Sequence, residues 1–280
     1  MFRILVSLMS LAVICACSSS RQIPSPKTSG EKASYLSSID NYLDNIIIQT
    51  PDKAIRIVDS ILTKAESDTA KMKIITRHIF DKYLRLINDD DDPKIIGMEN
   101  LVVHIIDNYY LAGKVKNIND EKFINEIIEY ADKNRETLIG KQAKNLKMET
   151  ITGGAESLYD IDSPYILLCF FDASCTHCQY EIPEIYKIFR KYRNKGLTGF
   201  CVYTRDDKKE WEEFVYKYKL IDWINAWDPT NENNFRIAYS LYSVPQVYVL
   251  DKDKKIVGRR LESASLTQFL NQLIKNKDNQ

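Results

Sequence analysis

The chain has 280 residues, of which 39 are basic and 39 acidic, so its formal net charge is +0. This balance, together with the lack of a long basic run, argues against a nucleic-acid partner. A chain of this length can bury its own core, and its six cysteines are too few for a scaffold held together by disulfides.

The first 17 residues have the pattern of an export signal. Arg3 provides a positive charge, and the apolar stretch 4–16 is too short to span a bilayer. The sequence at 14–17, Ile-Cys-Ala-Cys, is similar to a bacterial lipobox with Cys17 as the acylated residue, although isoleucine and cysteine stand where leucine and a small residue are usual. The alternative is an ordinary signal peptide that is removed without addition of a lipid.

A tract rich in serine and proline, 18–30, follows the signal and is predicted to be a flexible tether. We therefore expect a protein of the cell envelope that is lipid-anchored in the inner or outer membrane and faces the periplasm. Disulfides persist in such a compartment.

Residues 31–138 have the apolar spacing of helices. Hydrophobic side chains recur every three or four residues in five segments, at about 31–47, 51–62, 67–87, 93–113 and 120–133. Prolines stand at the first positions of the second and fourth segments, where the helix has no need of an N–H donor. The sequence predicts an all-helical module, and it does not indicate the function of this module.

From about residue 139 to residue 280, strand-like and helix-like segments alternate. This alternation predicts an α/β domain with a mixed sheet covered by helices on both faces. The expected order is a hairpin at 146–151 and 156–159, a strand at 165–171, a helix after 175, a strand at 199–203, a helix at 207–218, a strand at 224–227, a helix at 233–242, strands at 246–250 and 255–259, and a helix at 265–274.

The motif Cys175-Thr176-His177-Cys178 stands where the strand at 165–171 gives way to a helix. Unpaired N–H groups and the positive end of the dipole at a helix start favour a thiolate, which is the reacting form of cysteine. We therefore expect Cys175 to be a nucleophile. Cys178, one turn later, would then resolve the mixed disulfide that Cys175 forms.

Zinc binding and a purely structural disulfide are the alternatives for this cysteine pair. A structural zinc site needs about four ligands, and His78 and His104 lie in the helical half of the chain. A disulfide that closes so short a loop adds little stability. The sequence therefore predicts redox activity, with no metal and no cofactor.

The motif continues as C-x-x-C-x-x-E-x-P, and Ser243-Val244-Pro245 precedes a later strand-like run. With these features, residues from about 140 onward resemble the thioredoxin fold, and within it the TlpA/ResA-like periplasmic thiol–disulfide oxidoreductases. The resemblance implies that Cys175 attacks, Cys178 resolves, Glu181 assists proton transfer and Pro245 is a cis-proline that faces the disulfide.

The resemblance also implies partners and a domain order. The partners would be protein thiols or disulfides and a membrane redox protein that recycles the site. The helical half resembles an uncharacterised module that precedes thioredoxin-like domains in envelope lipoproteins of Gram-negative bacteria.

His177 stands where more reducing relatives carry proline. An imidazole that donates to the Cys175 thiolate, or stands near it as a cation, would stabilise the reduced form and raise the reduction potential. The alternative is a solvated histidine with little effect. Glu181 has a similar alternative as a simple surface residue.

Cys169 and Cys201 fall on two strands that are expected to be neighbours. Cys169 stands where many thioredoxins bury an acid, which leaves proton transfer to Glu181. Both cysteines are most simply small core residues, and a second redox pair is the alternative.

Two other functions compete with disulfide exchange. A thiol peroxidase needs P-x-x-x-T-x-x-C before its cysteine, but Leu168 and Asp172 occupy the proline and threonine places. A non-catalytic envelope binding protein, with the helical module as its working part, need not keep either the C-x-x-C motif or Pro245.

Overall fold

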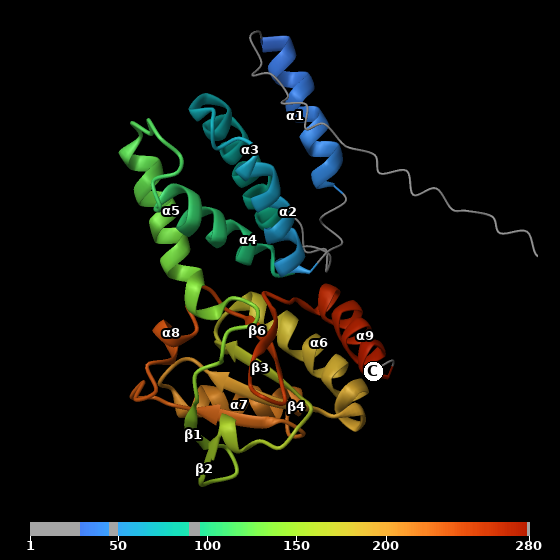
Figure 1. Ribbon diagram of the computed structural model, residues 1–280. Helices are drawn as coiled ribbons and strands as arrows, with labels where there is room; N and C mark the ends of the chain where they lie inside the picture. Colours follow the sequence, from blue (N-terminus) through green and yellow to red (C-terminus); the bar gives the residue numbers. More distant parts are fainter. Residues whose placement is uncertain (1–28, 45–49, 90–95, 279–280) are drawn as a thin grey trace, which may run out of the picture.

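The computed structural model describes residues 29–44, 50–89 and 96–278. The predicted signal peptide, Cys17 and most of the predicted tether lie outside these ranges. Figure 1 shows two parts, a group of helices at the amino-terminal end and a sheet with its own helices at the other end. None of the helices in the described ranges combines the length and the apolar character needed to cross a membrane.

The first part is all-helical, as predicted. Its helices are α1 (Ser29–Leu43), α2 (Pro51–Thr63), α3 (Thr69–Asp89), α4 (Met98–Ile105), which continues as the π-helical turn η2 (Ile106–Tyr110), and α5 (Glu121–Asn134). Their apolar faces meet in one core that includes Leu43, Val58, Ile79, Leu101 and Ile127. Burial of these faces, rather than the propensity of each segment, is what stabilises helices of this length.

Two predicted boundaries in this part are wrong. Positions 29 and 30, expected in the tether, already belong to α1. The apolar spacing predicts a fourth helix from 93, but residues 96 and 97 form a turn and α4 begins at Met98. Gly97 has a φ of 84°, which a right-handed helix cannot use. A Cβ atom at this position would stand 2.7 Å from the side chains of Pro51 and Ile139, so the close approach requires glycine.

The second part contains a seven-stranded sheet with the order β2-β1-β5-β4-β3-β6-β7. Strands β3, β4 and β5 are parallel, and the other pairings are antiparallel. The strands are β1 (Lys147–Thr150), β2 (Ala155–Ser157), β3 (Tyr165–Phe171), β4 (Leu197–Tyr203), β5 (Ile224–Trp227), β6 (Gln246–Asp251) and β7 (Ile256–Arg259). The predicted mixed sheet is therefore confirmed.

Helices cover both faces of this sheet. Alternate residues of β3 point to opposite sides, so Leu167, Cys169 and Phe171 pack in the same core as α6 (Thr176–Tyr192), α7 (Lys208–Tyr218) and α9 (Ser263–Asp278). Figure 1 shows α6 beside α9. On the other face, the intervening residues of β3 pack against α8 (Phe235–Ala238) and β1.

Helix α8 is much shorter than the predicted helix at 233–242. Asn234 and Ser240 on its two sides have positive φ values of 49° and 51°. A right-handed helix cannot continue through either residue, so only four residues remain helical. Tyr239, directly after α8, is fully buried against the sheet.

The segment that joins the two parts forms hydrogen bonds with both of them. The amide of Gly140 donates to the carbonyl oxygen of Ile256 at 2.8 Å, and the amide of Ala143 donates to that of Lys254 at 2.9 Å. The side chain of Asn100 in α4 bonds both the carbonyl oxygen and the amide of Ile139, at 2.9 and 3.1 Å.

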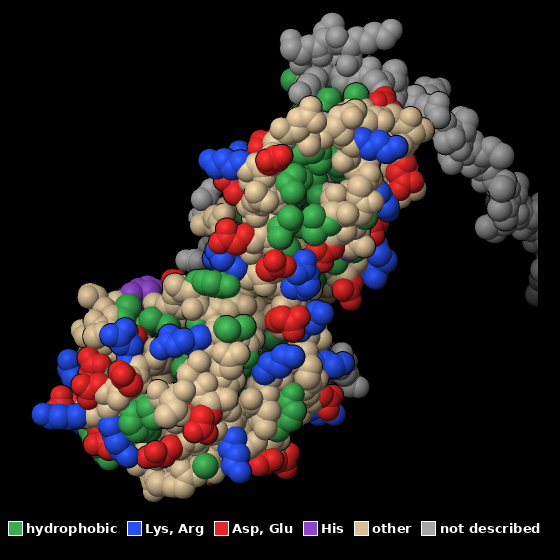
Figure 2. All heavy atoms as spheres, turned by 90° about the vertical axis from the view of Figure 1, so that its left-hand side faces the viewer, with side chains coloured by type: hydrophobic (Ala, Val, Ile, Leu, Met, Phe, Trp, Pro, Cys, Tyr) green, Lys and Arg blue, Asp and Glu red, His purple; other side chains and the backbone are tan. Residues whose placement is uncertain are grey.

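Figure 2 shows acidic and basic side chains interspersed over both lobes of one face of the molecule.

Candidate active site

Cys175 stands at the junction between β3 and α6. It is the N-cap residue of α6, with extended φ and ψ angles of −75° and 119°. Its amide donates to the carbonyl oxygen of Asp172 at 3.2 Å, and its own carbonyl oxygen accepts from the amide of Gln179 at 3.0 Å. Its side chain is only partly buried and the thiol is free, so a substrate sulfur can approach it.

Cys178, one helical turn later, is fully buried and also free. Burial is the main cause that raises the pKa of the Cys178 thiol, and the neighbouring Cys175 raises it further. A backbone hydrogen bond from Asp172 acts in the opposite direction. At neutral pH Cys178 is therefore a thiol, and it must lose its proton before it can attack a disulfide.

The loop before β6 meets the redox motif. The Val244–Pro245 peptide bond is cis, as the resemblance implied. The Sγ atom of Cys175 lies 3.7 Å from the carbonyl oxygen of Val244, within the range of a weak S–H···O hydrogen bond. The fold thus brings Pro245 beside the partly exposed cysteine.

Glu181 is buried with 4% of its surface exposed, so its interpretation as a simple surface residue is wrong. Its Oε2 accepts from the amide of Ser263 at 2.8 Å, and its Oε1 accepts from the hydroxyl of Ser263 at 3.0 Å. The carboxylate therefore binds the first residue of α9, where the helix dipole favours negative charge. Because Cys178 and Glu181 are three residues apart in α6, they lie on the same face of that helix.

His177 is half exposed, and its Nε2 lies 3.6 Å from Oε1 of Glu262. No sequence pattern indicated this carboxylate partner. The effect of His177 on the Cys175 thiolate stays a prediction, and any such effect now depends on the charge of Glu262 as well.

Cys169 and Cys201 are paired in the register of β3 and β4, and both are fully buried. Burial, followed by the neighbouring Cys169, raises the pKa of the Cys201 thiol well above its ordinary value. The two residues pack in the same core as Cys178. They fit the simpler interpretation as small core residues.

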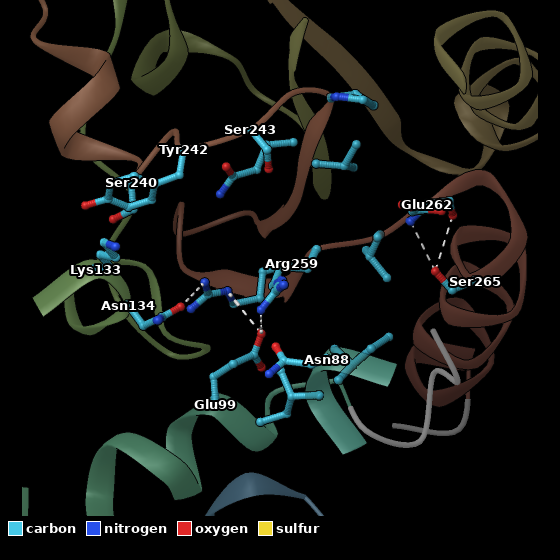
Figure 3. Close-up of a pocket in the computed structure, with 17 residues that line it drawn as sticks. Asn88, Glu99, Lys133, Asn134, Ser240, Tyr242, Ser243, Arg259, Glu262 and Ser265 are labelled. Atoms are coloured by element: carbon cyan, nitrogen blue, oxygen red, sulfur yellow. Dashed lines mark hydrogen bonds and ion pairs between the residues drawn. The ribbon is translucent and has the colours of Figure 1, made fainter. Parts of the chain in front are cut away.

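A pocket of about 470 Å³ lies next to this site, between the helical module and the sheet with its connecting loops. Pro245 and Glu262 line it together with a buried ion pair of Glu99 and Arg259 (Figure 3). The sequence did not predict Glu99 and Arg259 as site residues, because the two residues of this ion pair stand far apart in the chain. The available signals were Glu99 inside the apolar pattern of the fourth helix and the adjacent Arg259 and Arg260 at the end of a strand.

Residues 139–259 match the AhpC/TSA family. Among curated relatives, a thiol-disulfide oxidoreductase ResA of Bacillus cereus is 26% identical over 132 residues, which are 46% of this chain and 73% of that protein. Thioredoxin-like protein YneN of Bacillus subtilis (strain 168) is 27% identical over 115 residues, which are 40% of this chain and 65% of that protein.

Two solved structures extend the comparison. A thioredoxin-like protein from Bacteroides caccae ATCC 43185 has a TM-score of 0.59 at 20% identity, with 85% of this chain and 83% of that chain covered. A domain of a possible thiol-disulfide isomerase from Cytophaga hutchinsonii ATCC 33406 is 37% identical, with a TM-score of 0.48. This match covers 51% of this chain and 97% of that chain. The first match spans the helical part as well as the sheet.

The carboxyl-terminal part is therefore a thioredoxin-like domain that follows an all-helical module. The chain is an enzyme of the thiol–disulfide oxidoreductase class, with homologues of the ResA kind.

Proposed function

We propose that this protein is a lipid-anchored oxidoreductase of the cell envelope that exchanges disulfides with protein substrates through Cys175 and Cys178. The observation that carries the proposal is the unequal placement of the two thiols. Cys175 is accessible at the start of α6, whereas Cys178 is buried one turn behind it. This is the arrangement that an attacking and a resolving cysteine need.

In the reducing direction, the Cys175 thiolate attacks one sulfur of a substrate disulfide. A mixed disulfide forms, and the other substrate sulfur leaves as a thiolate that takes up a proton. Cys178 then loses its proton, attacks Sγ of Cys175 and releases the second substrate thiol. One substrate disulfide becomes two thiols, and the two enzyme thiols become the Cys175–Cys178 disulfide.

Each neighbouring residue has a role in this proposal. Glu181 accepts the Cys178 proton, because it is a buried carboxylate on the same face of α6. Pro245 lines the groove in which the substrate lies. His177 tunes the reduction potential, and a membrane redox partner returns the site to its starting state. In the oxidising direction the same steps run in reverse.

The location in the envelope rests on the sequence of the first 30 residues. An apolar segment that ends at Cys17, followed by a polar tract, supports export and acylation. A lipid on Cys17 would hold the enzyme at a membrane whose redox proteins could recycle it.

Reduction of insulin disulfides tests the proposed activity. The full chain without its signal, reduced beforehand, is expected to produce one oxidised C-x-x-C site for each disulfide lost from insulin. Cys175→Ser is expected to produce none, and Tyr216→Phe serves as a control on an exposed face. An inactive wild type, or a Cys175→Ser variant as fast as the wild type, would refute the proposal.

A further inference from the structure

The pocket of about 470 Å³ has polar walls that the proposed disulfide exchange does not use. Glu99 in α4 and Lys133 and Asn134 in α5 reach it from the helical module, and Arg259 and Arg260 reach it from the end of β7. Its volume falls within the range of about 300–1,000 Å³ that is typical of ligand sites. Figure 3 shows Glu99 and Arg259 pointing toward one another across this junction.

One end of the pocket carries an excess of positive charge. The side chains of Arg259 and Glu99 are only 2% and 5% exposed, and Nε of Arg259 lies 3.7 Å from Oε1 of Glu99. Nη1 of Arg260 lies 3.9 Å from the same oxygen atom. One carboxylate therefore faces two guanidinium groups, whereas Lys133 in the wall is already paired with Glu129. In a partly desolvated site this excess attracts an anion.

The hydrogen bonds of Arg259 are incomplete. Its Nη2 donates to Oδ1 of Asn134 at 2.7 Å. Its Nε and Nη1 atoms are buried and have no hydrogen-bond partner among the residues that the structure describes. A buried guanidinium with unpaired donors is costly unless further negative charge compensates it.

The pocket also reaches the redox site. Pro245, which lines it, directly follows Val244, whose carbonyl oxygen lies 3.7 Å from Sγ of Cys175. Glu262, at another wall, faces His177 of the C-x-x-C motif. A polypeptide whose sulfur reaches Cys175 can therefore place its neighbouring residues in the pocket.

We propose that this pocket is a specificity subsite that binds a carboxylate of a polypeptide substrate close to the cysteine that reacts with Cys175. The inference rests on the proposed function and adds the substrate class. Arg260, whose side chain is 47% exposed, contacts the carboxylate directly. The buried charge of Arg259 acts behind it, and the helical module becomes one wall of the substrate site.

The test compares symmetrical peptide disulfides that are acetylated and amidated at their ends. Each half carries one cysteine and one glutamate, placed two, three or four residues away on either side, and a matched series carries glutamine instead. A further glutamine peptide with a free carboxyl terminus distinguishes a terminal carboxylate from a side-chain one. Reduction by the reduced full chain is stopped with acid and measured by chromatography. Bis(2-hydroxyethyl) disulfide, which is small and neutral, measures disulfide exchange without the pocket.

We expect at least one peptide with a carboxylate to react about tenfold faster than its glutamine match, a difference that corresponds to ~1.4 kcal/mol. The preference should shrink in high salt. Arg259→Gln and Arg260→Gln should each reduce it, and the half-exposed Arg260 provides a variant whose folding is not at risk. Arg190→Gln, which removes an arginine paired to Asp222 at 3.4 Å on α6, should keep it.

Equal rates for every matched pair, with normal reduction of the small disulfide, would overturn the subsite and leave the proposed function intact. A preference that Arg260→Gln retains at wild-type size would also overturn it. If the reduced full chain reduces neither the peptide disulfides nor bis(2-hydroxyethyl) disulfide, the proposed function itself is refuted.

Discussion

Sγ of Cys175 lies 3.7 Å from the carbonyl oxygen of Val244, although 69 positions separate the two residues in the chain. One residue stands at the start of α6 and the other directly precedes the cis peptide bond to Pro245. Antiparallel pairing of β3 with β6 brings these two ends together, because Phe170 stands opposite Gln246. The candidate site is therefore a product of the sheet topology rather than of the C-x-x-C motif alone.

The first prediction concerns the base that activates Cys178. Glu181→Gln should slow decay of the mixed disulfide at neutral pH by about 100-fold, the lower end of what a positioned general base contributes. Burial raises the pKa of Cys178, so the lost rate should return as the pH rises and hydroxide takes the proton. Rapid-quench measurement of the mixed disulfide from neutral to alkaline pH follows both effects.

Ser263→Ala is the matched control for this prediction. It removes one hydrogen bond to the Glu181 carboxylate but keeps the carboxylate. If both variants slow decay equally at every pH, Glu181 serves only to hold the start of α9.

The second prediction concerns the reduction potential. His177→Pro should lower the potential of the Cys175–Cys178 couple, because it removes a donor that favours the thiolate. Since the pair of His177 and Glu262 is half exposed, solvent screens it, and we expect a change of no more than about 30 mV. Equilibration with glutathione buffers measures the potential.

Glu262→Gln separates the effect of the carboxylate from that of the imidazole. It removes a negative charge 3.6 Å from the imidazole and should leave the potential unchanged or higher. A potential that stays constant in His177→Pro would make the histidine a bystander.

The third prediction concerns stability at alkaline pH. The pKa of Cys178 is higher in the folded, reduced protein than in the unfolded chain. The contribution of this thiol to stability is therefore complete below the ordinary thiol pKa of about 8.5 and is lost as the pH rises above it. Between a pH well below this value and a pH one unit above it, the reduced wild type should lose about 1.4 kcal/mol more than Cys178→Ala loses. Urea unfolding on either side of the ordinary thiol pKa, in the presence of a reductant, gives both values, and equal losses would contradict the prediction.

The fourth prediction concerns the membrane anchor. Mass spectrometry of the mature protein should find a diacylglyceryl group on Cys17 as the first residue, because this cysteine closes the apolar segment and precedes the polar tract. Cys17→Ser should abolish the lipid while Cys15→Ser keeps it. An unmodified Cys17, or cleavage at another position, would refute the anchor.

The order of elements in the fold was predictable because their patterns are local. The apolar run of β3 is buried on both faces, and the five apolar stripes of the module all pack into one core. The wrong boundaries at α4 and α8 share one cause. Gly97 and Ser240 have positive φ values, and the hydrophobic pattern around them carries no information on backbone conformation.

The candidate site was only partly predictable. Cys175, Cys178 and the cis peptide bond at Pro245 followed from motifs, because their spacing is short or their sequence neighbours are distinctive. The partners of Glu181, His177 and Arg259 did not follow, since Ser263, Glu262 and Glu99 reach them only through tertiary packing. Charged residues far apart in the sequence give no signal of their pairing.

Trapping of mixed disulfides tests the division of roles between the two cysteines most directly. Reduced Cys178→Ala, Cys175→Ala and the double variant are each exposed to oxidised envelope proteins, quenched with a thiol-alkylating agent and separated without reductant. We predict that Cys178→Ala accumulates covalent complexes that a reductant dissolves, while Cys175→Ala and the double variant accumulate none. Equal trapping by the two single variants would contradict the account, because it would mean that the buried thiol of Cys178 attacks substrates as readily as the partly exposed thiol of Cys175.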